Sequence, residues 1–426
     1  MMDGRLSSRS RLWTVGFVLL LATAGLLNYL DRQMLSILAR PIQDELGMSE
    51  RDYAWIVSLF LIAYTIGNVI ASAVIDRIGA RYALLWMVGI WSVANALTGL
   101  AQDANQVAFT RMVLGCAEIG GFVAMAVIML ESFDASTRGH VNGICNATTM
   151  VGAAISPPLV VGIYLATDWR TTFFVGGAAG ILWCVAWLAL VRPRLEKRER
   201  HKDMRSSSIY PNRQMFEVAR SYILDARVWT IVFGKMLVYP VWYFYLFWFP
   251  KYLIDERGLT LADVGAVAWI VYLAAAVGSV CGGALSSILI RRGMAPFKAR
   301  LSSLGLAACI APAGGAIAWE PTITVTFALA SVVAFAQMTW QVNISSMVAD
   351  LLSREEITKV VAFAGVLTGI VGVLTTYLIG ILVSELSYRP SFLVMAAACP
   401  LAFSLLFTLS KRVRLRAVSP ASYMGS

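Results

Sequence analysis

Runs of about twenty apolar residues recur along the whole chain, and they limit it to one class of fold. Examples are Leu12–Leu30, Tyr82–Leu100, Phe173–Val191 and Ser391–Leu409. Such a run is long enough to cross a hydrocarbon core about 30 Å thick, and backbone hydrogen bonding in lipid then requires helices. Hydrophobic residues make up 58% of the chain and charged residues 14%, against about 45–50% and 25% in soluble domains. The sequence therefore predicts an all-α membrane protein.

Charged or turn-rich breaks between the apolar runs predict twelve transmembrane helices. The expected spans are 12–39, 53–75, 82–101, 106–132, 141–166, 173–191, 228–254, 264–290, 301–318, 323–351, 360–383 and 391–409. The longest hydrophilic stretch divides six spans from six. We therefore expect an N-terminal bundle at 1–191, a cytoplasmic linker at 192–227, and a C-terminal bundle with a basic tail at 228–426. Two pseudo-symmetric six-helix bundles are the layout of an alternating-access transporter.

Lysine and arginine are concentrated in alternate loops, which predicts the orientation of the spans. With the N-terminus inside, most basic loop residues are inside, and the outer loops hold Arg40, Arg51, Arg170, Lys251, Arg257 and Arg389. By the positive-inside rule, both termini are then cytoplasmic. The net charge of +10 has the same explanation. Nucleic-acid binding is the competing explanation, and it is disfavoured because the basic residues lie in short loops between spans.

Several classes of chemistry have no support in the sequence. The six cysteines fall inside expected spans without the close spacing of a metal site, so we expect no disulfide, metal ion or cofactor. No P-loop or nucleophile motif is present, so an ATP-driven pump or a membrane enzyme is not expected. The outer loops are short and both glycosylation sequons lie inside spans. A bacterial inner membrane is therefore the expected location.

The loop after the second span has a motif that predicts a conformational latch. It reads Ser72-x-x-x-Asp76-Arg77-x-Gly79-x-Arg81 and resembles the signature loop of the major facilitator superfamily. A tight turn at Gly79 would leave Asp76, Arg77 and Arg81 free to bond helix ends. Their partners would include Glu131 and Asp350, the acids that end spans four and ten. Alternatively, these are solvated loop charges that only set topology.

Five charged residues fall inside expected spans: Asp31, Arg32, Arg111, Glu118 and Lys235. Each costs about 3 kcal/mol at the bilayer centre, so each is a candidate functional residue. The apolar pattern continues beyond Arg32, although span one could instead end before Asp31 and leave this pair at the outer interface. Arg111 and Glu118 are seven positions apart, about 700° of rotation, so they share one helix face. They would line a cavity or form a structural ion pair.

The balance of these charges favours an anionic substrate and proton coupling. Three cations against two acids make a positive cavity, although Lys235 could instead extend to the cytoplasmic surface. His140 and His201 fall in expected inner loops, so proton coupling must rest on Asp31 and Glu118. Movement of a neighbouring arginine would change the proton affinity of these carboxylates and so link proton and substrate binding.

Two motifs carry a resemblance to a known family. They read Asn28-Tyr29-Leu30-Asp31-Arg32-Gln33 and Arg111-x-x-x-Gly115-x-x-Glu118. Together they resemble the anion:cation symporter family of the major facilitator superfamily. Within that family the chain resembles hexuronate and other sugar-acid transporters, through Ile155–Val161, Pro240–Leu253 and Leu285–Gly293.

The resemblance implies roles for individual residues. Asp31 and Glu118 match the proton-linked acids, and Arg32 matches the arginine that holds the substrate carboxylate. Arg111 would form an ion pair with Glu118, and Tyr64 would reach the sugar hydroxyls. The chain departs from hexuronate transporters at some positions, for example where Lys235 replaces an arginine and Gln337 a histidine, which leaves the substrate open.

Further substrate contacts are expected from polar and aromatic residues of the two motifs and of span ten. These are Tyr29, Gln337, Trp340, Gln341 and Asn343. The amides could bond sugar hydroxyls while the aromatic residues of span seven stack on the sugar ring or lie at the membrane interface. For Gln341 and Asn343 the alternative is hydrogen bonding between helices.

Together these features predict a monomeric importer of a hexuronate or related sugar acid, driven by proton symport through alternating access. The expected partners are a small organic anion, protons and the lipid bilayer, with no nucleic acid. An aromatic or dicarboxylic acid:proton symporter is the alternative within the same class of transporter. A proton-driven drug exporter is disfavoured by the positive cavity. A non-transporting sensor is disfavoured because no extra domain is present.

Overall fold

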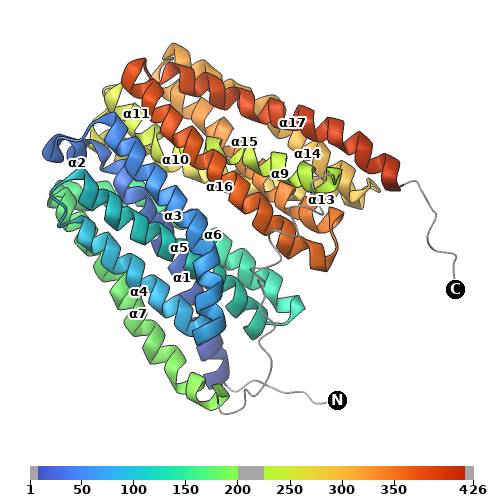
Figure 1. Cartoon of the computed structure of the whole chain (residues 1–426), viewed down its shortest axis with the longest axis horizontal. Helices are drawn as coiled ribbons and strands as arrows, with labels where there is room; N and C mark the ends of the chain where they lie inside the picture. The colour runs from blue at the N-terminus through green and yellow to red at the C-terminus, as the bar shows by residue number, and fades with distance from the viewer. Residues whose placement is uncertain (1–7, 200–224, 418–426) are drawn as a thin grey trace. The chain divides into compact units, whose positions relative to one another are not determined.

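The computed structural model describes residues 8–199 and 225–417, and within these ranges the chain is helical without strands. It forms two compact units, which we call unit 1 and unit 2. Unit 1 contains the helices up to residue 199 and also α12, and unit 2 contains the other helices (Figure 1). The predicted linker lies mostly outside the described residues, so the boundaries at 191 and 228 stay predictions.

In its described residues, unit 1 has seven helices before the linker and one short helix after it. They are α1 (Ser8–Ile37), α2 (Ala39–Leu46), α3 (Glu50–Ile78), α4 (Ala80–Thr98), α5 (Ala104–Ser132), α6 (Ala135–Ala166), α7 (Trp169–Glu199) and α12 (Leu261–Val267). In Figure 1, α5 lies between α3 and α4, and α4 packs on α7. Helix α1 packs against α6 and α7, and α12 packs against α6.

Unit 2 contains several helices that are broken by proline. Its elements are α9 (Ala226–Met236), α10 (Tyr239–Phe247), α11 (Phe249–Asp255), α13 (Trp269–Arg291), α14 (Pro296–Ile310), the 3₁₀ helix η1 (Ala311–Trp319), α15 (Ile323–Leu351), α16 (Arg354–Glu385) and α17 (Arg389–Ala417). The expected span 228–254 is three short helices because Pro240 and Pro250 cannot donate backbone hydrogen bonds. Likewise, the expected span 301–318 is completed by η1, which contains Pro312.

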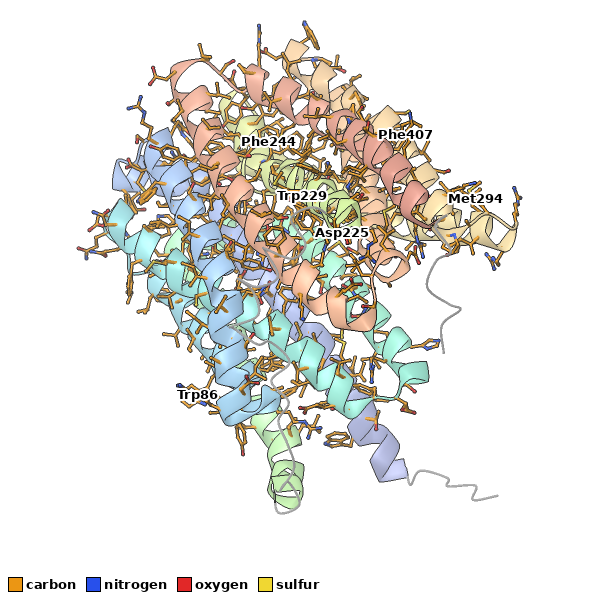
Figure 2. All side chains as sticks on the ribbon, turned by 45° about the vertical axis from the view of Figure 1, so that its right-hand side comes forward. Trp86, Asp225, Trp229, Phe244, Met294 and Phe407 are labelled. Carbon is orange, nitrogen blue, oxygen red and sulfur yellow. The ribbon has the colours of Figure 1, made fainter. Side chains whose placement is uncertain are left out.

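Eleven helices are long and apolar enough to cross a membrane, counted over the two described ranges. The expected span at 82–101 coincides with α4, which is not among the eleven because Arg81 and Asn95 lower its mean hydropathy. Large apolar side chains are exposed on α4 and on many of the eleven helices, for example Trp86 of α4 at 62% and Phe407 of α17 at 47% (Figure 2). Such exposure suits contact with lipid. The all-α membrane fold is confirmed, whereas the count of twelve and the orientation stay predictions.

The turn between α3 and α4 is tight, as the sequence predicts. Helix α3 ends at Ile78 and α4 begins at Ala80. Gly79 joins them with a φ of 79°, a conformation that a residue without a Cβ adopts readily. His140, in contrast, was expected in a loop and lies in α6, at the start of a candidate span. His201 lies outside the described residues.

Helices α3 and α5 are in direct backbone contact at two glycines. A Cβ added at Gly115 would lie 2.6 Å from the carbonyl oxygen of Phe60, and one added at Gly67 would lie 2.8 Å from the Cα of Cys116. Neither position can accept a larger residue without a shift of the backbone. The two contacts therefore fix the register of α3 against α5.

Candidate functional site

Helix α1 continues for more than a turn beyond Asp31 and Arg32. It ends at Ile37, and the side chains of Asp31 and Arg32 are 0% and 6% exposed. Both lie within the candidate membrane span Trp13–Ile37. The structure thus favours the intramembrane interpretation of this pair over a position at the outer interface.

Arg32 is paired with Glu118 of α5. Its Nε lies 2.9 Å and its Nη2 2.7 Å from Glu118 Oε2. Nη2 also donates to Asn28 Oδ1 at 3.2 Å. Glu118 is fully buried, and its other oxygen, Oε1, has no hydrogen-bond partner in the described part of the chain. One carboxylate oxygen therefore receives two charge-assisted bonds while the other is available to a proton.

Three aromatic rings surround the Arg32 guanidinium. Its Cζ lies 5.1 Å from the ring centroid of Tyr29, 5.5 Å from that of Phe60 and 4.8 Å from that of Tyr64. These distances allow cation–π attraction, which is stronger in a desolvated site. The sequence analysis singled out Tyr29 and Tyr64 and missed Phe60, whose contact depends on the register of α3 against α5.

Arg111 does not form the expected ion pair with Glu118. Its Nη2 donates to Asn95 Oδ1 and Thr98 Oγ1, both at 2.8 Å. Positions seven residues apart differ by about 10.5 Å along a helix, and the acceptors on α4 are nearer. In addition, Glu118 Oε2 already receives two bonds from Arg32. The shared helix face was predicted correctly, but the partner of each charge was not.

Asp31 is connected to Arg111 through Asn95. The Nδ2 of Asn95 donates to Asp31 Oδ1 at 2.9 Å, while its Oδ1 accepts from Arg111. The second oxygen of Asp31, Oδ2, has no hydrogen-bond partner among residues 8–199 and 225–417. This site thus holds two cations, Arg32 and Arg111, and two acids, Asp31 and Glu118, and these four charges balance when both acids are ionised. Balance matters because an unpaired buried charge is costly.

The predicted contacts of span ten lie in α15 of unit 2, and three of them are fully buried. Trp340 donates from its indole to the Gly234 carbonyl at 2.7 Å, and Asn343 donates to the Gly282 carbonyl at 3.0 Å. Gln337 lies 3.5 Å from the Cys399 sulfur. This geometry favours hydrogen bonding between helices over ligand binding for Asn343, and the same holds for Trp340.

Two other candidates of unit 2 are less buried. Lys235 is half-buried in the last turn of α9, and within the described residues its ammonium has no hydrogen-bond partner. Gln341 is half-buried on α15. These two side chains therefore remain the better candidates for ligand contact in this unit.

The aromatic run of span seven forms part of the core of unit 2. Trp242, Tyr245, Trp248 and Tyr252 are all at most 5% exposed. Tyr252 packs edge-on against Phe392 of α17, with 4.8 Å between ring centroids. These four residues pack helices together, whereas Tyr243 of the same run is half-buried.

Lys251 was counted among the outer loops, and this assignment was wrong. It lies in α11, is fully buried and pairs with Asp255 one turn later. Asp255 also accepts a hydrogen bond from the Tyr388 hydroxyl at 3.2 Å. This pair of a buried lysine and a partly exposed aspartate is a polar cluster of unit 2 that the sequence analysis missed, although the i, i+4 spacing of opposite charges is a signal for it.

The expected latch residues of unit 1 occupy different environments. Asp76 and Arg77 are exposed. Arg81 is 9% exposed and donates to Ser132 Oγ at 3.1 Å, next to the exposed Glu131. Arg81 thus bonds the end of α5, as the latch hypothesis expects of a loop arginine.

In unit 2 the corresponding acid is paired within the unit. Asp350 Oδ2 lies 3.3 Å from the Nε of Arg300, and Arg300 also donates to Ser286 Oγ at 2.8 Å. A role of Asp350 and of the unit 1 residues in a cytoplasmic latch stays a prediction.

Bacterial sugar-acid carriers are among the relatives of this chain. It is 30% identical to a probable L-galactonate transporter of Escherichia coli, over 66% of this chain and 64% of that protein. It is 24% identical to the hexuronate transporter of E. coli, over 89% of this chain and 90% of that protein. The hexuronate transporter of Bacillus subtilis is 26% identical over 86% of this chain and 87% of its own length.

Solved structures share the fold at low sequence identity. A bacterial homologue of the lysosomal transporter Spinster superposes with a TM-score of 0.68 at 17% identity, over 95% of this chain and 96% of that one. The nucleoside transporter NupG gives 0.71 at 10% identity, over 92% and 99%. The sequence profile of the Major Facilitator Superfamily matches residues 21–345. The chain is therefore a membrane transporter, not an enzyme, and it belongs to the Major Facilitator Superfamily.

Proposed function

We propose that this transporter imports a hexuronate or a related sugar acid together with protons, by alternating access. The observation that carries the proposal is the buried pair of Arg32 and Glu118, at 2.7 Å, inside a ring of three aromatic side chains. The names of the relatives support the substrate class, because they include galactonate, hexuronate and galacturonate transporters.

The substrate carboxylate replaces the carboxylate of Glu118 on Arg32. Both are planar anions that can accept from the guanidinium fork. When a proton binds Glu118 Oε1, the side chain becomes neutral and its attraction to Arg32 weakens. The arginine is then available to the incoming anion, so proton and substrate bind together. The acids Asp31 and Glu118 are the proposed proton sites.

The remaining substrate contacts follow from burial. Tyr29 and Tyr64 are half-buried beside Arg32, so their hydroxyls can bond the hydroxyls of a sugar acid. Lys235 and Gln341 are the proposed ligand contacts of unit 2.

The other span-ten residues have a different proposed role. Gln337, Trp340 and Asn343 are fully buried and bonded to neighbouring helices. We assign them to holding α15 in place, which fits helix association through polar groups in membranes.

The proposed location is the plasma membrane of a bacterium, with the protein as a monomer and both termini cytoplasmic. Many apolar helices and the bacterial relatives support an integral membrane protein of this kind.

The test is transport by the purified protein in proteoliposomes on a solid-supported membrane. A panel of hexuronates, aldonates, aromatic acids and dicarboxylic acids is applied at one pH. We expect proton-coupled currents with sugar acids and none with aromatic acids. Currents with aromatic or dicarboxylic acids alone would establish the alternative substrate class, and no current with any anion would refute the proposal.

A further inference from the structure

Asn95 of α4 lies between the acid of α1 and the cation of α5. Its side chain is fully buried. It donates to Asp31 Oδ1 at 2.9 Å and accepts from Arg111 Nη2 at 2.8 Å. Neither the substrate proposal nor the residue roles described above give this amide a function.

The orientation of the Asn95 amide follows from chemistry. A guanidinium has only donors, so the amide oxygen must face Arg111 and the amide nitrogen must face Asp31. The two N–H groups of Nδ2 point to Asp31 Oδ1 and to the Met34 sulfur, the latter at 3.4 Å. Asp31 Oδ1 therefore accepts a hydrogen bond in either protonation state. A proton on Asp31 must bind Oδ2, the oxygen without a hydrogen-bond partner in the described chain.

The two buried acids Asp31 and Glu118 differ in how they meet a cation. Glu118 touches Arg32 directly at 2.7 Å, whereas the side chain of Asp31 meets that of Arg111 only through Asn95. Protonation of Asp31 leaves Arg111 with its bonds to Asn95 and Thr98. Asp31 can therefore gain and lose a proton while Arg111 keeps these two hydrogen bonds, whereas protonation of Glu118 weakens the direct bonds of Arg32.

The charged groups that face Asp31 come from α5 and are Arg111 and Glu118. Its neighbour on α1, Arg32, is paired with Glu118. Helices α4 and α7 contribute Asn95, Trp91 and Gly176 near this carboxylate. The titratable residues of α6 lie toward its ends or are cysteine, and none is paired with Asp31 in the described structure.

Gly176 of α7 closes this site. A Cβ added there would lie 2.7 Å from Asn95 Nδ2 and 2.9 Å from Asp31 Oδ1. Helix α7 therefore packs directly over the bond between the two side chains and leaves no room for water on that side. In such a dry environment a hydrogen bond and a charge interact more strongly than in water.

We propose that Asn95 is a positioning residue that sets the proton affinity of Asp31, by donating to Oδ1 and by keeping Arg111 from direct contact with the carboxylate. This inference deepens the proposed function, because it assumes that Asp31 is a coupling acid. A direct ion pair would hold Asp31 ionised, and a site without any bridging donor would favour the neutral acid. With the amide in place, Asp31 is held neither always ionised nor always neutral, so it can bind and release a proton.

The first test is Asn95→Asp, which has nearly the same shape. The new carboxylate pairs with Arg111 and turns an acceptor toward Asp31, so Asp31 can bond it only when protonated. Two carboxylates that interact this closely shift each other's pKa values by more than about one unit. We expect the pH midpoint of proton-driven uptake to rise by about one unit or more, while substrate counterflow persists. An unchanged midpoint would overturn the proposal.

The second test exchanges the two residues in the double variant Asp31→Asn with Asn95→Asp. The hydrogen bond is kept with donor and acceptor reversed. If the network has only a structural role, the double variant should therefore behave like wild type. Our proposal expects the opposite shift, to lower pH, because the acid now touches Arg111 directly. A double variant with the wild-type midpoint would refute it. This variant also covers the case in which Asn95→Asp alone does not fold.

Thr98→Val is the matched control. It removes the other Arg111 bond, at 2.8 Å, and leaves the contact of Asn95 with Asp31 in place. We expect a lower melting temperature with no shift of the pH midpoint. A shift as large as that of Asn95→Asp would assign the effect to Arg111 in general and not to Asn95.

A readout without substrate separates this inference from the proposed function. The infrared band of protonated carboxyl groups is titrated in the substrate-free protein. Asp31→Asn identifies the contribution of Asp31 in wild type and in Asn95→Asp, and in the double variant the band of the carboxyl group introduced at position 95 is followed. We expect the same opposite shifts of the titration midpoint in the two variants. If wild type transports no sugar acid and the band shifts as expected, only the proposed substrate fails. If wild type transports and the band does not shift, only the role of Asn95 fails.

Discussion

Replacement of Glu118 by glutamine should separate substrate exchange from proton coupling. In the structure, Glu118 Oε2 accepts from Arg32 at 2.9 and 2.7 Å. The amide oxygen of a glutamine can take the same two bonds, and Asn28 still accepts from Arg32 at 3.2 Å. The variant therefore keeps the geometry and imitates the protonated acid, but it cannot release a proton.

The expected cost in stability follows from these contacts. Removing one partner of a buried ion pair costs about 3–5 kcal/mol, and this is the expectation for Glu118→Ala. Glutamine retains an acceptor for a charged donor, which contributes about 1.5–3 kcal/mol. The loss for Glu118→Gln should accordingly be about 2 kcal/mol. No hydrogen bond of Arg111 is lost in this variant, because Arg111 bonds Asn95 and Thr98.

The assay uses proteoliposomes and a labelled sugar acid that wild type transports. We expect Glu118→Gln to retain counterflow, in which internal and external substrate exchange, and to lose accumulation driven by a pH gradient. Its melting temperature in detergent should fall less than that of Glu118→Ala.

Loss of counterflow and of gradient-driven uptake, with a melting temperature as low as that of Glu118→Ala, would refute this reasoning. Glu118 would then be a permanent ion partner of Arg32. Asp31 would remain as the proton site of unit 1.

Four further predictions concern other parts of the molecule. Arg32→Lys should abolish the rise in melting temperature that a sugar acid produces, because an ammonium lacks the planar fork; equal stabilisation would contradict the assignment. If both acids carry protons, the driving force for uptake of a monoanion at fixed pH should increase by about 2.3 kcal/mol per 100 mV of inside-negative potential. Uptake that does not depend on the potential would leave at most one coupling acid. Gly176→Ala should cost about 1–3 kcal/mol through overpacking, whereas Gly162→Ala, with no atom within 4 Å of the new Cβ, should not lower the melting temperature. The indole of Trp169, with help from Arg170, lowers the pKa of Glu45 below its usual 4.5. This contact therefore stabilises the protein above pH 4.5, and the stabilisation is lost as the pH falls through the lowered pKa. The melting temperature of Glu45→Gln should accordingly depend less on acid pH than that of wild type.

The apolar runs and the charges inside them predicted the main features of unit 1. The run that continues past Arg32 predicted a helix through this pair, and α1 does extend to Ile37. The spacing of Arg111 and Glu118 correctly placed both on one face of α5. These predictions succeed because helix periodicity depends on local sequence alone.

The partners of the charges could not be predicted in the same way. Which arginine meets Glu118 depends on how α1 approaches α5, and periodicity within one helix has no information about a second helix. The preference of Arg111 for α4 depends on Asn95 and Thr98. Together with Ser92 these form a polar line at spacings of three in an otherwise apolar helix, which is the signal that the sequence analysis overlooked.

In unit 2 the sequence was misleading for a different reason. The same amide and aromatic side chains can either bind a ligand or join helices, and the sequence alone does not distinguish these two uses. Trp340 and Asn343 bond the backbone at Gly234 and Gly282, where the absence of side chains lets helices approach closely. Only the distance between helices distinguishes the two uses, and this distance is a property of the folded protein.

The glycine contacts of α3 and α5 have a consequence for how this carrier can acquire new cargo. Gly67 and Gly115 fix the two helices through backbone atoms, so the alignment of the pair does not depend on the side chains around Arg32. Tyr29 and Tyr64 can therefore be exchanged without moving Glu118, the proposed proton site. Selection for a different substrate, in nature or in a laboratory library, can then alter recognition while energy conversion is inherited intact. A library at these two tyrosines, with both glycines left unchanged, is the direct route to carriers of other acids.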